Sequence, residues 1–132
     1  MYWKRKFHQA IQDPSDFIRS CKAPAWVFDQ ESLSFLDVND AAVQEYGYSA
    51  QDLLSMTILD IRPVEDVPNL LHETLDPAHR GPSTHELWIH RRKDGTTFPV
   101  LITSKETTFR GRAAEIVIAV PKNAHWPVAL DT

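Results

Sequence analysis

The side chains best suited to chemistry lie on one expected strand, residues 84–92. Because side chains alternate along a strand, Glu86, Trp88 and His90 share one face of it. A carboxylate and an imidazole on one face can shift each other's pKa and transfer protons, as the acid–base pair of an enzyme does. The same mixture of aromatic surface and a few polar groups is also typical of a ligand pocket.

The remaining reactive residues form no recognised catalytic or metal motif. Cys21 is the single cysteine, which excludes an intramolecular disulfide and fits a reducing compartment. His72 lies on an otherwise apolar expected helix, a setting typical of structural or surface histidines. His79, His85 and His90 lack the spacing of a metal site and have no thiolates beside them. No Gly-x-Ser-x-Gly elbow occurs, and four glycines build no phosphate loop, so we expect no metal and no catalytic nucleophile.

Composition restricts the class of protein further. The chain has 132 residues, enough for one domain with its own core, and its 42% hydrophobic and 24% charged residues are ordinary for a globular protein. A net charge of −4 argues against a primary role on nucleic acid. No apolar run approaches the roughly 20 residues of a membrane helix, and no signal peptide follows the basic first residues. We therefore predict a soluble, cytoplasmic domain that binds neither nucleic acid nor membrane by itself.

The first part of the chain predicts two short helices. Trp3, Phe7 and Ile11 recur at helical spacing, which indicates either an arm packed on the domain or a helix that dimerises or links to another domain. The segment 13–15 ends this helix, and Ser15 is expected to cap the next one.

The middle of the chain predicts a hairpin followed by short helices. Asn39 is a suitable N-cap and Gly47 a suitable left-handed C-cap for the first of these helices. Ser49 and Thr57 are expected to cap the next two. The predicted elements are a hairpin over 24–38 with its second strand at 33–38, helices over 40–46, about 50–54 and 58–61, and a longer helix over 65–75.

The last part of the chain predicts three strands, over residues 84–92, 98–107 and 115–120. Asp94-Gly95 predicts a type I′ hairpin turn, and the segment 109–112 a second turn. The last strand is almost continuously apolar, as expected for a central strand. Helices on one face of a single antiparallel sheet satisfy this order, which is an α+β fold.

Four motifs stand in a characteristic order along the chain: Phe28-Asp29, Asn39-Asp40-Ala41-Ala42, Tyr46-Gly47-Tyr48-Ser49 with Asp52-Leu53-Leu54, and Arg92-Lys93-Asp94-Gly95-Thr96-Thr97-Phe98-Pro99. With these motifs, the chain resembles a PAS domain over residues 24–120.

The resemblance implies a five-stranded antiparallel sheet in the order 2-1-5-4-3, with short helices over a small-molecule cavity on one face and an N-terminal flanking helix. It also implies a non-catalytic sensory or dimerisation module of a signalling protein such as a histidine kinase, a cyclic-dinucleotide enzyme or a transcription regulator. The expected parts are flanking helices over 1–22, the PAS domain over 23–121 and a tail over 122–132.

The chain departs from the family pattern in two segments. Residues 63–66 read Pro-Val-Glu-Asp where many members have His-Pro-Asp-Asp, and residues 121–124 read Pro-Lys-Asn-Ala where many begin a coiled-coil output helix. The second departure makes the N-terminal helix the expected route of coupling to an effector domain, unless the domain works alone.

The resemblance also allows two cofactors to be considered. A covalent flavin needs a cysteine beside the cavity, and Cys21 precedes the first strand instead. The iron-ligating histidine of haem sensors would fall near Asp66, and His72 lies about 240° further around the helix. Glu86 occupies the position of the arginine that contacts bound oxygen. We therefore expect neither flavin nor haem, and the ligand stays unknown.

Three hypotheses follow. In the first, the domain senses a small molecule in a cavity whose candidate residues are Glu86, Trp88, His90, Ile102, Ser104 and His72. In the second, Trp88 fills the cavity and the domain is a ligand-free contact module. Its homodimer surface would combine Trp3, Phe7 and Ile11 with Leu87, Ile89 and Leu101, which face outward. In the third, Glu86 and His90 are the acid and base of a small cone-shaped isomerase-type enzyme, although the order of helices argues against such a fold.

Overall fold

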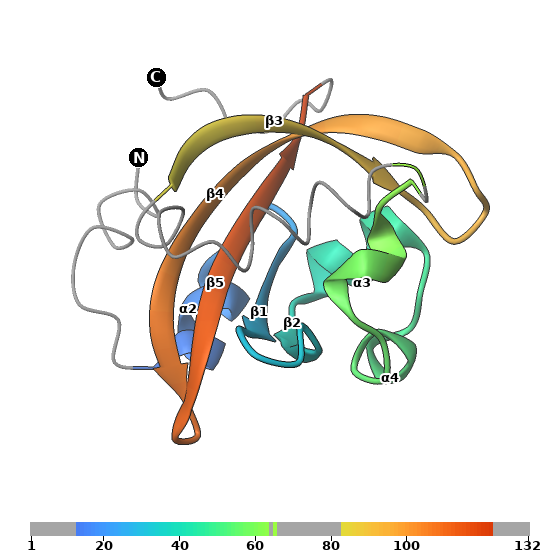
Figure 1. Ribbon diagram of the computed structural model, residues 1–132. Helices are drawn as coiled ribbons and strands as arrows, with labels where there is room; N and C mark the ends of the chain where they lie inside the picture. The colour runs from blue at the N-terminus through green and yellow to red at the C-terminus, as the bar shows by residue number, and fades with distance from the viewer. Residues whose placement is uncertain (1–12, 64, 66–82, 123–132) are drawn as a thin grey trace.

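Figure 1 shows the computed structural model, which describes residues 13–63, 65 and 83–122. Five antiparallel strands form one sheet in the order β2-β1-β5-β4-β3, which confirms the predicted topology. The described elements are α2 (Pro14–Ser20), β1 (Ala25–Asp29), β2 (Phe35–Val38), α3 (Asp40–Tyr46), α4 (Ala50–Leu53), the 3₁₀ helix η1 (Ile58–Ile61), β3 (Ser83–Arg91), β4 (Thr97–Phe109) and β5 (Arg112–Pro121).

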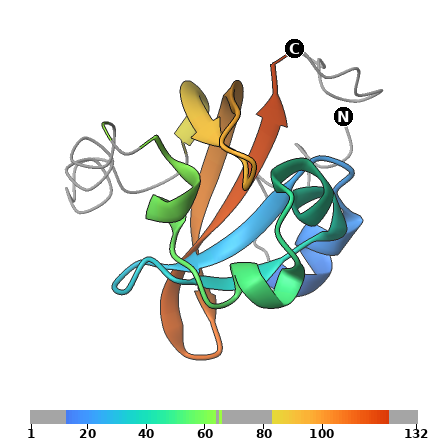
Figure 2. The same cartoon turned by 90° about the vertical axis from the view of Figure 1, so that its right-hand side faces the viewer.

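The sheet is covered on both faces around β1 and β5. One face packs against α2 through residues such as Ile18, Val27 and Ile116, all of them fully buried. The other face carries Trp26 and Val117 and packs against α3, α4 and η1, which lie in front of the sheet in Figure 2. This second cluster is the interior in which a site would lie.

Asn39 ties three elements together, which explains its position between β2 and α3. Its side-chain oxygen accepts hydrogen bonds from the backbone amides of Ala25 and Ala42, at 3.0 Å each. Its side-chain nitrogen donates to the carbonyl oxygens of Ile18 and Ala23, at 2.9 Å each. The predicted N-cap of α3 is therefore confirmed, and the same side chain also fixes α2 against β1.

The cap of α2 differs from the prediction. Asp13, rather than Ser15, is the N-cap, and its carboxylate accepts the amide of Asp16 at 3.2 Å. Pro14 occupies the first helical turn, where a missing amide proton costs little, and this moves the cap one residue before it. The hydroxyl of Ser15 donates instead to the carboxylate of Asp37 on β2.

The type I′ turn lies in a different hairpin from the predicted one. Arg110 (φ 50°) and Gly111 (φ 79°) are the two loop residues between β4 and β5, and both have the positive φ that this turn needs. In the β3–β4 hairpin only Gly95 has positive φ (90°), and its amide donates to the carbonyl of Arg92 at 3.0 Å. The amide of Arg92 also donates to the carbonyl of Thr96 at 2.8 Å, so residues 93–95 form a three-residue loop with its glycine in the left-handed position.

The start of β2 differs from the prediction, and three predicted segments lie outside the described residues. The second strand begins at Phe35, because Leu33 has a positive φ of 66° and belongs to the turn. The predicted arm over residues 1–12, most of the helix over 65–75 and the tail after 122 lie outside the described residues. Within the described part of the chain, no helix is long and apolar enough to span a membrane.

Candidate functional site

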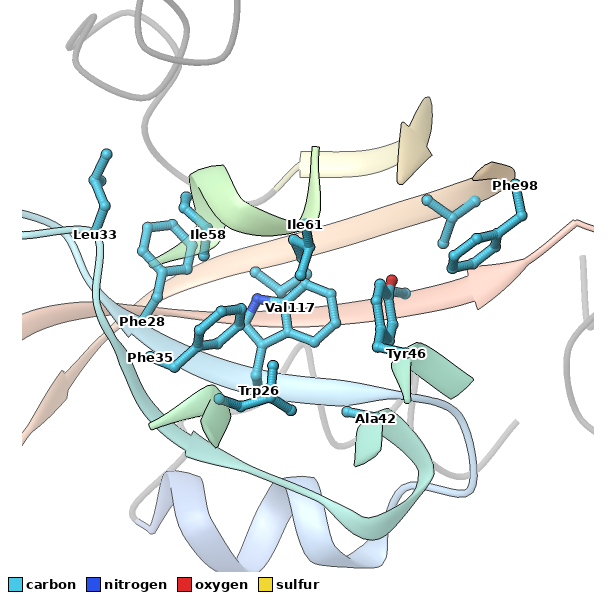
Figure 3. Packing of buried hydrophobic residues seen from close by; sticks show 13 residues of the cluster. Trp26, Phe28, Leu33, Phe35, Ala42, Tyr46, Ile58, Ile61, Phe98 and Val117 are labelled. Carbon is cyan, nitrogen blue, oxygen red and sulfur yellow. The ribbon is translucent and has the colours of Figure 1, made fainter. Parts of the chain in front are cut away.

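Four aromatic rings form the centre of the interior cluster, where β1, α3, β3 and β4 meet. Trp26 lies 5.6 Å from Tyr46 and 6.0 Å from His90, measured between ring centroids. Phe98 contacts Tyr46 edge-on at 5.3 Å. Figure 3 shows Trp26 in the middle of this cluster, with Tyr46 and Phe98 on one side. These four rings pack together between the sheet and α3, and three of them carry a polar group.

A short hydrogen bond joins two of these rings. The hydroxyl of Tyr46 lies 2.6 Å from Nδ1 of His90, and both side chains are buried. Burial, and to a smaller extent the positive charge of Arg62, lowers the pKa of His90 to about 3. The imidazole is therefore neutral near pH 7. The described residues offer the Tyr46 hydroxyl no other hydrogen-bond partner, so this hydroxyl donates to Nδ1 and the imidazole proton lies on Nε2.

The indole N–H of Trp26 is the second polar group of the site. Trp26 is only 3% exposed, and no acceptor within the described ranges lies in hydrogen-bond distance of its Nε1 atom. Figure 3 shows this nitrogen on the side of the ring that faces Ile58 and Ile61 of η1, away from Ala42. A buried donor without an acceptor costs about 1–3 kcal/mol, which makes it a candidate contact for a ligand.

A buried arginine places a charge near the same cluster. Arg62 follows η1 and is 4% exposed, and its guanidinium stacks on the ring of Trp88 with 4.1 Å between the guanidinium carbon and the ring centroid. This geometry is a cation–π contact. Trp88 is therefore half-buried and held under Arg62.

The structure brings together several of the residues predicted from the strand pattern. His90 and Ser104 are buried, while Trp88 and Ile102 are partly buried against the interior cluster. Glu86 pairs with Ile102 in the strand register, but its side chain lies outside the described residues, as does His72.

On the opposite face of β3, Leu87 is 55% and Ile89 39% exposed, as the alternation predicts. Leu101 pairs with Leu87 on β4 and is partly buried. The predicted contacts of Trp3, Phe7 and Ile11 lie outside the described residues. The β3 face defined by Leu87 and Ile89 is thus an exposed apolar surface on an edge strand.

Sequence reasoning missed Trp26, Tyr46 and Arg62 as members of the site. The sequence places Trp26 in the expected hairpin over 24–38 and Tyr46 at the end of the expected helix over 40–46, but it assigned neither to a site. The alternation along β1 could have placed Trp26 on the same face as Phe28, since Ala25 and Val27 face α2. The sequence gives no indication that Arg62 is buried in the site, because an arginine after a short helix is usually exposed.

The acid–base hypothesis for Glu86 and His90 gains no support from the geometry of the described residues. A base with a pKa of about 3 accepts protons poorly near neutral pH. Burial also raises the pKa of the Cys21 thiol to about 12, which leaves it unreactive. Among the described residues no group of three or more His, Cys, Asp or Glu could hold a metal ion.

Comparison with known families decides the class of protein. The family model described as the PAS fold matches residues 12–120. The chain belongs to the PAS family. PAS domains are generally sensory signalling modules, and the resemblance stated from the sequence is thereby confirmed.

Solved structures similar to this PAS domain have the same fold. A PAS domain from a two-component sensor histidine kinase has 23% identity, covers 92% of this chain and 98% of its own, and has a TM-score of 0.67. The PAS domain of an HTR-like protein from Haloarcula marismortui has 16% identity, coverages of 81% and 87%, and a TM-score of 0.68. A PAS domain of a LuxR-family transcriptional regulator from Burkholderia thailandensis, solved in complex with ethanol, has 15% identity, coverages of 81% and 95%, and a TM-score of 0.65. A comparison with curated protein sequences found no significant match.

The PAS domain also has a surface cleft of about 820 Å³ between the end of α3 and the β3–β4 hairpin. Glu45 and Arg92 form an ion pair of 2.7 Å across it, and the Arg92 guanidinium covers the ring of Phe98 at 4.0 Å. The backbone amide of Lys93 donates to the carbonyl of Tyr46 at 2.9 Å. These contacts fix α3 against the hairpin.

Proposed function

We propose that this PAS domain senses a small molecule in the interior between the sheet and η1, and passes the signal to an effector domain. The observation that supports this most is the indole N–H of Trp26, which is buried and lacks an acceptor among the described residues. Folding tolerates such a donor more easily when a bound molecule supplies the acceptor. The neighbouring Tyr46–His90 pair would hold one wall of this proposed ligand chamber in a fixed arrangement.

The signal would leave through the β3 strand. Trp88 and His90 face the chamber on this strand, and Leu87 and Ile89 face outward. A molecule that moves Trp88 or His90 would therefore shift the outer face of the same backbone. The effector, attached or separate, belongs to the class of histidine kinases, cyclic-dinucleotide enzymes or transcription regulators.

A thermal-shift screen of small molecules tests the sensing function. A ligand at about 10 times its Kd adds about 1.4 kcal/mol to the free energy of unfolding and raises Tm by several degrees. We expect such hits for the wild-type domain. They should be lost in Ala119→Phe, because Ala119 is fully buried on the interior face and a phenyl ring there would occupy ligand space.

A chamber with no room for a ligand gives the opposite pattern. Overpacking then destabilises Ala119→Phe by about 1–3 kcal/mol, and no compound stabilises the wild type. That result would favour a ligand-free contact module in which protein side chains such as Trp88 fill the space.

We further propose that a second copy of the chain covers the outward face of β3. Exposed branched side chains on an edge strand are a typical self-association surface, and Leu87 is the most exposed of the large hydrophobic residues described. We expect Leu87→Glu to convert a dimer into a monomer in sedimentation velocity. Leu54→Glu is the matched control, because Leu54 is 45% exposed after α4, and it should leave the dimer intact. A monomeric wild type, or equal effects of the two variants, would contradict the proposal.

A further inference from the structure

The surface cleft between α3 and the β3–β4 hairpin collects charged side chains from three segments of the chain. These segments are the connection after α2, the end of α3 and the hairpin loop. The charged residues that line the cleft are Lys22, Glu45, Arg92, Lys93 and Asp94. Three cations thus face two carboxylates, although the chain as a whole has a net charge of −4. The cleft therefore has the opposite sign of charge from the whole chain.

Both carboxylates of the cleft already take part in contacts within its walls. Oε2 of Glu45 accepts hydrogen bonds from Nη2 of Arg92 at 2.7 Å and from Nε at 3.2 Å. Oδ1 of Asp94 accepts the hydroxyl of Thr96 at 2.6 Å and its amide at 2.9 Å. Glu45 thus neutralises Arg92, and Asp94 stabilises the hairpin loop.

The two lysines of the cleft are not engaged in this way. Lys22 and Lys93 are both exposed, and within the part of the chain that the structure describes neither ammonium group has a hydrogen-bond or ion-pair partner. The side-chain amide of Gln44, which lines the same cleft, is equally unengaged there. An ammonium group can only donate hydrogen bonds. The groups that the cleft leaves available are therefore two cations and an amide, which suit an anionic partner.

The walls of the cleft are held in one relative position. The amide of Lys93 donates to the carbonyl of Tyr46 at 2.9 Å, and Nε of Arg92 donates to the carbonyl of Glu45 at 3.1 Å. The Arg92 guanidinium also lies over the buried ring of Phe98. A surface that is ordered before binding loses less conformational entropy when a partner binds.

We propose that this cleft binds an acidic segment of a partner protein, whose carboxylates pair with Lys22 and Lys93. The two lysines come from different segments of the chain, which suits carboxylates spaced along a peptide. Arg92 offers no free fork for a phosphate, because Glu45 occupies its guanidinium. The proposal concerns a surface site and does not depend on the ligand chamber proposed above.

The expected interaction is weak and sensitive to salt. Ion pairs between exposed side chains each contribute little to affinity, and salt screens them. Their main effect is to speed the encounter with a partner of opposite charge and to select against partners of the same charge. Such a contact fits a signalling module that binds and releases its partner.

Nuclear magnetic resonance of the backbone amides tests the proposal with a short synthetic peptide of alternating glutamate and serine. We expect the peptide to shift the peak of Gly47, which lines the cleft, in a saturable and salt-sensitive way. The matching peptide with glutamine in place of glutamate should bind at least about 5-fold more weakly. Gly111 is the internal control, because it lies in the β4–β5 turn between Arg110 and Arg112, outside the cleft.

Two double variants separate the cleft from the general charge of the domain. Lys22→Gln with Lys93→Gln should weaken binding of the glutamate peptide by about 5-fold. Arg110→Gln with Lys122→Gln is the matched control, because it removes the same charge from exposed positions outside the cleft. The control should change the affinity by less than about 2-fold.

Three results would overturn the proposal. They are equal losses in the two double variants, equal shifts of the Gly47 and Gly111 peaks, and equal binding of the glutamate and glutamine peptides. Saturable shifts caused by inorganic phosphate, which the glutamate peptide does not reverse, would also contradict it and would assign the cleft to a compact anion. None of these results bears on the sensing function, which the thermal-shift screen tests separately.

Discussion

Replacing Asn39 with alanine is expected to lower the free energy of unfolding by about 3–5 kcal/mol. The substitution removes the N-cap of α3 and leaves the buried amides of Ala25 and Ala42 without their acceptor. It also removes the donor to the carbonyls of Ile18 and Ala23, so α2 loses its link to β1. Chemical denaturation followed by circular dichroism measures the change.

Two further variants make this prediction specific. Ser49→Ala removes an exposed N-cap, whose hydroxyl accepts the amide of Asp52 at 3.0 Å, and should cost about 1 kcal/mol. Asn39→Asp keeps a capping oxygen but places a second oxygen opposite two carbonyl groups, and should still destabilise strongly. A near-wild-type Asn39→Asp would show that capping alone explains the role of Asn39.

Acidification from pH 7.5 to 5 is expected to cost the domain about 2 kcal/mol through His90 alone. The pKa of His90 is about 3 in the folded protein, mainly because of burial, against 6.5 for an ordinary histidine. Between these values the unfolded chain binds a proton that the folded chain does not. The contribution of His90 to the free energy of unfolding is therefore fully present above pH 6.5. It falls by about 1.4 kcal/mol per pH unit as the pH decreases toward 3.

Unfolding curves of two variants across this pH range test the assignment. His90→Gln should be less stable at pH 7.5 but should lose about 2 kcal/mol less than the wild type on going to pH 5. Tyr46→Phe removes the hydroxyl that bonds to Nδ1 but leaves the imidazole buried, so it should keep the steep acid dependence. Parallel curves for the wild type and His90→Gln would refute the assignment.

Local chemistry predicted the parts of the fold that depend on a few neighbouring residues. Asn39 and Gly47 at the ends of α3 and Thr57 before η1 are caps that the sequence identifies directly. The cap of α2 was misplaced because Asp13 and Ser15 are both capping residues, and the proline between them favours the first.

Turn types were harder to predict because they depend on how the strands pair. A dipeptide such as Asp94-Gly95 fits a two-residue loop, but β3 ends at Arg91 and β4 begins at Thr97, so a longer loop forms. The order of the strands followed from the resemblance to PAS domains rather than from periodicity. Periodicity identifies strands but leaves several pairings open.

The candidate site was predictable only in part. Alternation along β3 predicted that His90 faces the interior and Leu87 faces outward. The burial of His90 and the exposure of Leu87 confirm this prediction. The hydrogen bond between Tyr46 and His90 joins residues 44 positions apart, and no local pattern indicates it. Arg62 is buried and stacks on Trp88, an arrangement that likewise depends on the tertiary fold. The roles of Glu86 and His72 in ligand binding stay predictions, as does the cytoplasmic location.

Mass spectrometry of freshly purified protein, under native and then denaturing conditions, tests the central claim most directly. We predict a native mass that exceeds the 15.1 kDa chain, or twice that mass for a dimer, by a small molecule that is lost on denaturation. A bare chain mass, together with no stabilising compound in the thermal-shift screen, would contradict the claim that this PAS domain is a small-molecule sensor.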